Sequence, residues 1–131
     1  MKTLHRNKRK LYLCKAYFDE TTGRRKFEAP IEIYENWQVT NTDAEFLNIG
    51  LELFNYARIR TSIEHADYYH VGDKLYLFTK PSKLPTKEDP TFDEFATTAD
   101  YQVYKDPIIT LNEVTVWLQK LSGHNKNDNI Y

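Results

Sequence analysis

The 131-residue chain contains a single cysteine, Cys14, and only four glycines. One cysteine cannot form a disulfide within the chain, which favours a reducing compartment or a fold that is indifferent to redox state. The glycines all stand at predicted turns or chain ends, so no glycine-rich loop is present to cradle a phosphate. The lack of a glycine-rich loop argues against P-loop and Rossmann functions.

Long apolar runs are also missing. No stretch of about 18 consecutive apolar residues occurs, so we expect no membrane-spanning segment and no membrane partner. Residues 1–10 are basic but lack the apolar run of a signal peptide. The length suits one domain, which at this size can bury a core without cross-links. The sequence therefore predicts a single soluble, intracellular domain.

Aromatic residues and an uneven charge distribution stand out among what is present. The chain has 10 Tyr, 7 Phe and 2 Trp, and such side chains favour strands and contact surfaces. The net charge of −1 divides into +7 over residues 1–26 and −8 over residues 27–131. We predict a flexible basic arm over residues 1–9. Its candidate contact residues extend one position further, and they are Arg6, Lys8, Arg9 and Lys10.

The basic arm has two physical uses and one neutral interpretation. It can contact nucleic-acid phosphates, or it can dock on the acidic face of a neighbouring copy. The alternative is a solvated, frayed terminus.

Alternating apolar and polar residues predict a mostly β fold. A capping box, Thr42 to Glu45, predicts one short helix over residues 43–49, and Gly23 closes a predicted hairpin turn. Local connections favour antiparallel pairing, and closure into a small antiparallel β-barrel removes exposed edges. The domain is expected over residues 10–122, with a flexible tail at 123–131. The predicted strands are 10–18, a return strand near 26, 31–34, 37–40, 51–63, 75–78, 100–105 and 107–121.

A long loop over residues 79–99 is the second distinctive segment. Loops of this length within a compact domain are usually functional or disordered. It combines acidic residues with two phenylalanines, which predicts an inter-subunit or channel-facing loop. Its candidate contact residues are Lys83, Glu88, Asp89, Phe92, Asp93, Glu94 and Phe95.

Few residues offer catalytic or metal chemistry. His65, Asp67 and His70 could together ligate a divalent metal, but their spacing fits no established pattern, and a polar loop is the simpler interpretation. Cys14 could act as a nucleophile, but its apolar neighbours favour a buried, inert thiol. We therefore expect no enzyme activity and no cofactor, and we place a metal-dependent enzyme third among the hypotheses.

A basic and aromatic strand face supports a second hypothesis. Phe54, Tyr56, Arg58 and Arg60 alternate onto one face, and this combination on a small barrel can bind single-stranded nucleic acid. The alternative is a set of paired charges on a half-buried face.

Four segments resemble the small neck proteins of tailed bacteriophages. They are Ala57-Arg58-Ile59-Arg60-Thr61, then His70-Val71-Gly72-Asp73-Lys74-Leu75-Tyr76-Leu77, then Ala99-Asp100-Tyr101-Gln102-Val103, and the stretch from Asn112 to Leu121. The order and spacing of these strand motifs, over roughly residues 50–121, are most similar to head-closure (stopper) proteins.

The resemblance implies a structural virion protein of the head–tail connector, assembled in the host cytoplasm. It implies a β-barrel repeated in a ring, expected to be a hexamer, which joins head to tail and retains packaged DNA. The implied partners are other copies of the chain, adaptor or portal-side and tail-side virion proteins, and the packaged DNA. The basic arm and the Trp37 region match nothing in the family pattern, so an adaptor, a tail terminator or another minor virion component stays open.

Overall fold

The computed structural model describes residues 8–39 and 56–121. Within them lie nine strands and one short 3-10 helix. No helix in these two ranges is long and apolar enough to cross a membrane. In chain order the elements are β1 (Arg9–Cys14), β2 (Ala16–Asp19), β3 (Arg24–Phe27), β4 (Ile31–Val39), β5 (Tyr56–Ser62), η3 (Ile63–Tyr68), β6 (Lys74–Tyr76), β7 (Tyr101–Val103), β8 (Ile108–Thr110) and β9 (Glu113–Lys120).

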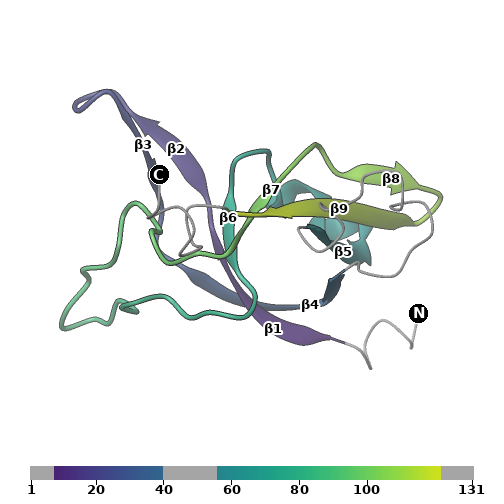
Figure 1. Ribbon diagram of the computed structural model, residues 1–131, viewed down its shortest axis with the longest axis horizontal. Helices are drawn as coiled ribbons and strands as arrows, with labels where there is room; N and C mark the ends of the chain where they lie inside the picture. Colours follow the sequence, from purple (N-terminus) through teal and green to yellow (C-terminus); the bar gives the residue numbers. More distant parts are fainter. Residues whose placement is uncertain (1–7, 40–55, 122–131) are drawn as a thin grey trace, which may run out of the picture.

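Six strands close into an antiparallel barrel in the order β5-β4-β1-β6-β7-β9, because β9 pairs back onto β5 (Figure 1). The β5–β9 pairing is the longest and runs from Tyr56 opposite Gln119 to Ser62 opposite Glu113. β8 pairs with the first half of β9, beside β7 on the same edge. The predicted mostly β, small antiparallel barrel is confirmed.

The barrel interior is a single apolar cluster to which every barrel strand contributes. Alternation explains it, because successive side chains of a strand point to opposite faces. In β9 the buried residues are Val114, Val116 and Leu118, each fully buried, and their neighbours are less buried. The other strands contribute to the same cluster mainly Leu11, Leu13, Trp37, Ala57, Ile59, Leu75, Tyr101 and Val103.

A second apolar cluster lies on the outer face of β1, so this strand is buried on both sides. Tyr12 and Cys14 point away from the barrel interior and pack with Phe27 and Tyr76. Ala96 and Ala99, from the end of the long loop, complete the cluster. The hairpin and the loop therefore cover the part of the barrel from which they emerge.

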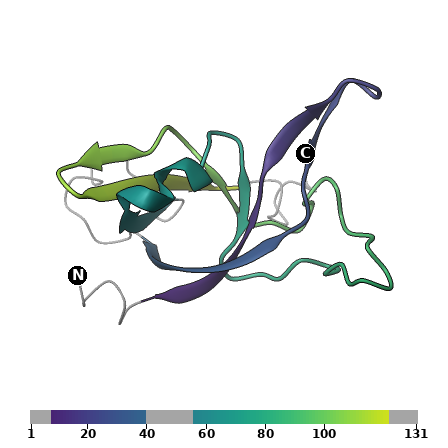
Figure 2. The ribbon, with the colours of Figure 1, turned by 180° about the vertical axis from the view of Figure 1, so that it is seen from behind.

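The hairpin predicted after residue 18 is confirmed as β2–β3. Gly23 takes a left-handed φ of +73°, which glycine adopts without steric cost. Pro30 lies between β3 and β4, consistent with the break predicted there. The hairpin extends beyond the barrel on the same side as the long loop (Figures 1 and 2).

Two strand predictions were wrong. Residues 10–18, predicted as one strand, form β1 and β2, which belong to different sheets. The segment 107–121, also predicted as one strand, is a hairpin, β8–β9, and its turn contains Leu111 at φ +49°. The reason is visible in the pattern, because the apolar positions change from odd numbers (Ile109, Leu111) to even numbers (Val114, Val116). A continuous strand cannot change faces in this way without an inserted turn.

The short helix that the structure describes, η3, replaces the polar loop expected around residues 65–70. The helix predicted at 43–49 and the tail at 123–131 lie outside the described residues. The long loop carries no strand between Tyr76 and Tyr101. Its two ends are joined by Asp100, whose buried carboxylate accepts the amides of Leu77 and Phe78, both at 2.9 Å.

Candidate functional site: a pocket beside η3 and exposed apolar tips

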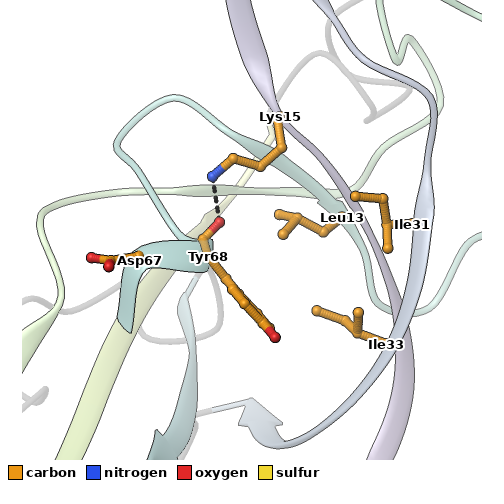
Figure 3. Close-up of a pocket in the computed structure, with 6 residues that line it drawn as sticks. All are labelled: Leu13, Lys15, Ile31, Ile33, Asp67 and Tyr68. Atoms are coloured by element: carbon orange, nitrogen blue, oxygen red, sulfur yellow. Dashed lines mark hydrogen bonds between the residues drawn. The ribbon is translucent and has the colours of Figure 1, made fainter. Parts of the chain in front are cut away.

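A pocket of about 300 Å³ opens between η3 and the β1–β4 strand pair. In Figure 3, Leu13, Ile31 and Ile33 line one wall and the Tyr68 ring faces them. Leu13 and Ile31 are direct cross-strand partners, so register places them side by side. We call this space the η3 pocket. Its lining is mainly apolar, which is typical of a site that receives an apolar group.

The one cation at the η3 pocket is already neutralised. Lys15 Nζ lies 2.6 Å from Oδ2 of the buried Asp73 and also donates to the Tyr68 carbonyl and to His70 Nδ1. Asp73 in turn accepts the Ala16 amide at 2.9 Å and the His70 amide at 3.0 Å. The carboxylate therefore joins the start of β2 to the turn before β6, and it offsets the lysine charge.

A second buried carboxylate, Glu35, holds η3 against the strands. Its Oε2 accepts the Tyr69 hydroxyl at 2.7 Å and lies 2.9 Å from His65 Nδ1. Burial first, and then the Glu35 charge, raise the pKa of Tyr69 well above its ordinary value, so the hydroxyl stays protonated and donates. The Thr61 hydroxyl also contacts His65 Nδ1, at 3.2 Å. These contacts fix η3, and with it the Tyr68 wall of the pocket.

The three residues considered as metal ligands have different surroundings and do not converge on one site. His65 is engaged by Glu35, and His70 is largely exposed beside Lys15. The Asp67 carboxylate points away from the pocket in Figure 3. Among residues 8–39 and 56–121, no group of three or more His, Cys, Asp or Glu side chains is placed to hold a metal ion.

Cys14 is buried in the cluster outside β1, with 1% of its surface exposed. Burial, followed by the Asp93 charge, raises the pKa of its thiol to about 12 from 9.0. At pH 8 the thiolate is therefore roughly a thousandfold scarcer than for an ordinary thiol.

We predict that native protein at pH 8 resists alkylation of Cys14 by iodoacetamide, while protein in denaturant is modified within minutes. Intact-mass spectrometry measures the modified fraction over time. Equal alkylation rates in the two states would contradict this placement of the thiol.

The predicted basic and aromatic face is largely used within the chain. Arg60 forms a two-pronged ion pair with Glu113, with Nε and Nη2 each 3.0 Å from a carboxylate oxygen. Tyr56 is buried, and its ring makes an edge contact with the Tyr104 ring, with 5.4 Å between the ring centres. Arg58 is half-buried, and its Nε has no hydrogen-bond partner. Phe54 lies outside the described residues. The charge that a nucleic acid would use at Arg60 is already compensated.

The predicted basic arm meets the fold at Arg9, where β1 begins. The Arg9 guanidinium lies 3.6 Å from the centre of the Trp37 ring and donates to the Trp37 carbonyl at 3.2 Å. Lys8 and Lys10 are exposed, and Arg6 lies outside the described residues. Arg9 therefore anchors the strand start rather than belonging to a free arm.

The long loop divides into an exposed part and a docked part. Residues 82–91 are mostly exposed, including Glu88, and within them Lys83 pairs with Asp89. From residue 92 onward the loop turns back to its own chain, and Phe92 is half-buried.

The docked part of the loop is held by the β2–β3 hairpin and by its own turn. The Glu94 carbonyl accepts the Phe27 amide at 2.7 Å, and Arg24 lies over the Phe95 ring at 4.9 Å. Asp93 accepts the amides of Phe95 and Thr97. This part of the loop therefore contacts its own chain, whereas residues 82–91 are mostly exposed.

Exposed large apolar side chains are spread over the described surface, and five of the thirteen lie on the two projecting hairpins. Tyr17 and Phe18 are 40% and 63% exposed on β2, while Ile109 and Leu111 are 57% and 96% exposed on the β8–β9 hairpin. The hairpins lie at opposite ends of the molecule in Figures 1 and 2. Leu111, Asp73 and Glu35 are functional candidates that sequence patterns alone do not identify. The change of parity after Leu111 was the available signal for the first, whereas nothing local marked the two carboxylates.

Comparison with known proteins adds no relative: no family model, no curated protein and no solved structure matches this chain.

Proposed function

We propose that this chain is a non-enzymatic structural protein of the phage head–tail connector, which acts as a ring of identical copies that joins head to tail and retains packaged DNA. The observation that carries the proposal is the exposure of large apolar residues on two hairpins at opposite ends of a closed barrel. Exposed apolar side chains at two separate places support contacts with two neighbours, and two different surfaces on one subunit suit a ring.

The polar groups support the same assignment, because they serve packing within the subunit. The buried carboxylates Asp73, Glu35 and Asp100 each accept hydrogen bonds from their own chain. The nucleic-acid alternative loses support, since Arg60 is paired with Glu113 and Tyr56 is buried. A stopper is the component that the sequence resemblance favours, and the exposed loop residues 82–91 are proposed to meet adaptor-side or tail-side neighbours.

The test is electron microscopy of particles produced when the coding sequence is deleted from its phage genome. We expect separate tails and heads that have lost their DNA, with joined virions restored when the intact protein is supplied in trans. DNA-filled heads joined to tails in the deletion would contradict the proposal.

A further inference from the structure

The most exposed large apolar residue among the described residues is also held in an unfavourable backbone conformation. Leu111 is 96% exposed at the β8–β9 turn and has a φ of +49°. Bulky residues rarely adopt left-handed φ values, whereas Gly, Asn and Asp do so readily. A leucine here is unfavourable both in backbone conformation and in solvation, and such an outlier points to a functional demand.

The residues around Leu111 are exposed, uncharged and partly apolar. Ile108 and Ile109 on the adjoining strand are 41% and 57% exposed. From Pro107 to Asn112 the sequence contains no charged residue. Exposed strands are usually protected by charge, and this one is not.

The η3 pocket is also mainly apolar. Leu13, Ile31 and Ile33 supply aliphatic walls, and Tyr68 closes the opposite side (Figure 3). Its cation, Lys15, is offset by Asp73 at 2.6 Å, so the pocket does not demand an anionic ligand. A volume of about 300 Å³ accommodates a branched aliphatic side chain with its flanking atoms.

We infer that Leu111 of one copy inserts into the η3 pocket of a second copy. Within one chain Leu111 is almost fully exposed, so it does not fill its own pocket. The η3 pocket lies between η3 and the β1–β4 pair, whereas Leu111 stands at the turn that joins β8 to β9, so the two are different surfaces of one chain. A contact between two different surfaces is head-to-tail, and its repetition gives a ring or a filament. The inference rests on the proposed function, for which it supplies the contact between neighbours.

Cysteine cross-linking tests the contact directly, because the native Cys14 is buried. We propose two single variants, Leu111→Cys and Ile31→Cys, oxidised separately and as a mixture at high protein concentration. Heterologous insertion predicts disulfide-linked heterodimers in the mixture, at least about tenfold more abundant than in a control mixture of Leu111→Cys with Lys87→Cys. Lys87 is exposed in the long loop.

A competition experiment separates docking from folding. Excess wild-type chain should suppress the cross-link, while excess of a double variant, Leu111→Asn with Ile31→Asp, should not, because it offers neither the inserting side chain nor an apolar pocket. Asparagine tolerates the left-handed conformation and Ile31 is 48% exposed, so circular dichroism should show that this variant is folded. Suppression by both chains would overturn the inference.

The remaining outcomes are equally decisive. Leu111→Cys alone cross-linking as fast as the mixture would show a two-fold β8 contact instead, and no excess over the Lys87→Cys control would show that Leu111 docks elsewhere. A failed cross-link alongside disconnected heads and tails in the deletion particles would reject only this contact. A successful cross-link alongside normal virions would reject only the connector role.

Discussion

Replacing Asp73 with alanine is expected to lower the free energy of unfolding by about 3 kcal/mol. The carboxylate is buried and accepts three donors, which are the Lys15 ammonium and the amides of Ala16 and His70. Alanine leaves the two amides without an acceptor and Lys15 without its counter-charge. Lys15 is partly exposed, so water recovers some of its loss, and the expected cost lies at the lower end for a broken buried pair. Urea denaturation followed by tryptophan fluorescence measures the change.

Two control variants identify which part of the Asp73 interaction matters. Lys15→Met removes the cation but leaves both amide bonds to the buried carboxylate, and we expect a smaller cost of about 2 kcal/mol. Asp73→Asn keeps the side-chain shape but has one acceptor oxygen and places an NH₂ donor where the second acceptor was. Its loss of unfolding free energy should lie between those of Asp73→Ala and Lys15→Met. A Lys15→Met loss equal to that of Asp73→Ala would show that the ion pair, rather than the joining of β2 to the turn, carries the stability.

Local signals were sufficient to predict the hairpin and the barrel class. The β2–β3 turn follows from Gly23, and the interior faces of β5 and β9 follow from alternation at Ala57, Ile59 and Val116. Such signals are read within a few residues, and closure follows from the need to pair every strand edge. The order of strands around the barrel depends on long-range pairing, which no local feature of the sequence indicates.

In β1 the alternation expected of a strand does not predict which side chains are buried. Its residues Leu11, Tyr12, Leu13 and Cys14 are all buried, although a strand facing solvent on one side would bury only half of them. The outer face is covered by Phe27 and by the end of the long loop. Which segment covers a strand is a property of the tertiary fold, so the sequence predicted the strand but not its double burial.

The candidate site was harder to predict than the fold, because its polar residues act over long sequence separations. Asp73 meets Lys15 across 58 positions, and Glu35 meets Tyr69 across 34. Acidic residues usually lie on the surface, so neither position suggested burial. His65 was singled out for metal chemistry because of its neighbours in sequence, whereas its partner in space is Glu35.

Replacing Glu35 with alanine is expected to cost about 3 kcal/mol of unfolding free energy, because it removes a side chain that is 1% exposed and leaves the Tyr69 hydroxyl without its acceptor. Tyr69→Phe removes only the donor and should cost about 1 kcal/mol. In the double variant the two losses should fall short of additivity by at least about 1 kcal/mol, since the hydroxyl can lose its acceptor only once.

The same cycle reports on the η3 pocket, because Tyr69 directly follows the helix that supplies Tyr68. We expect Glu35→Ala to raise amide hydrogen exchange in residues 63–69 more than in β6 and β7, while Glu35→Gln, which keeps an acceptor of the same shape, leaves this difference small. Hydrogen exchange with mass spectrometry resolves the segments. Uniform loss of protection across the barrel, or additive losses in the cycle, would mean that Glu35 supports the barrel as a whole and that the pocket wall is held by other contacts.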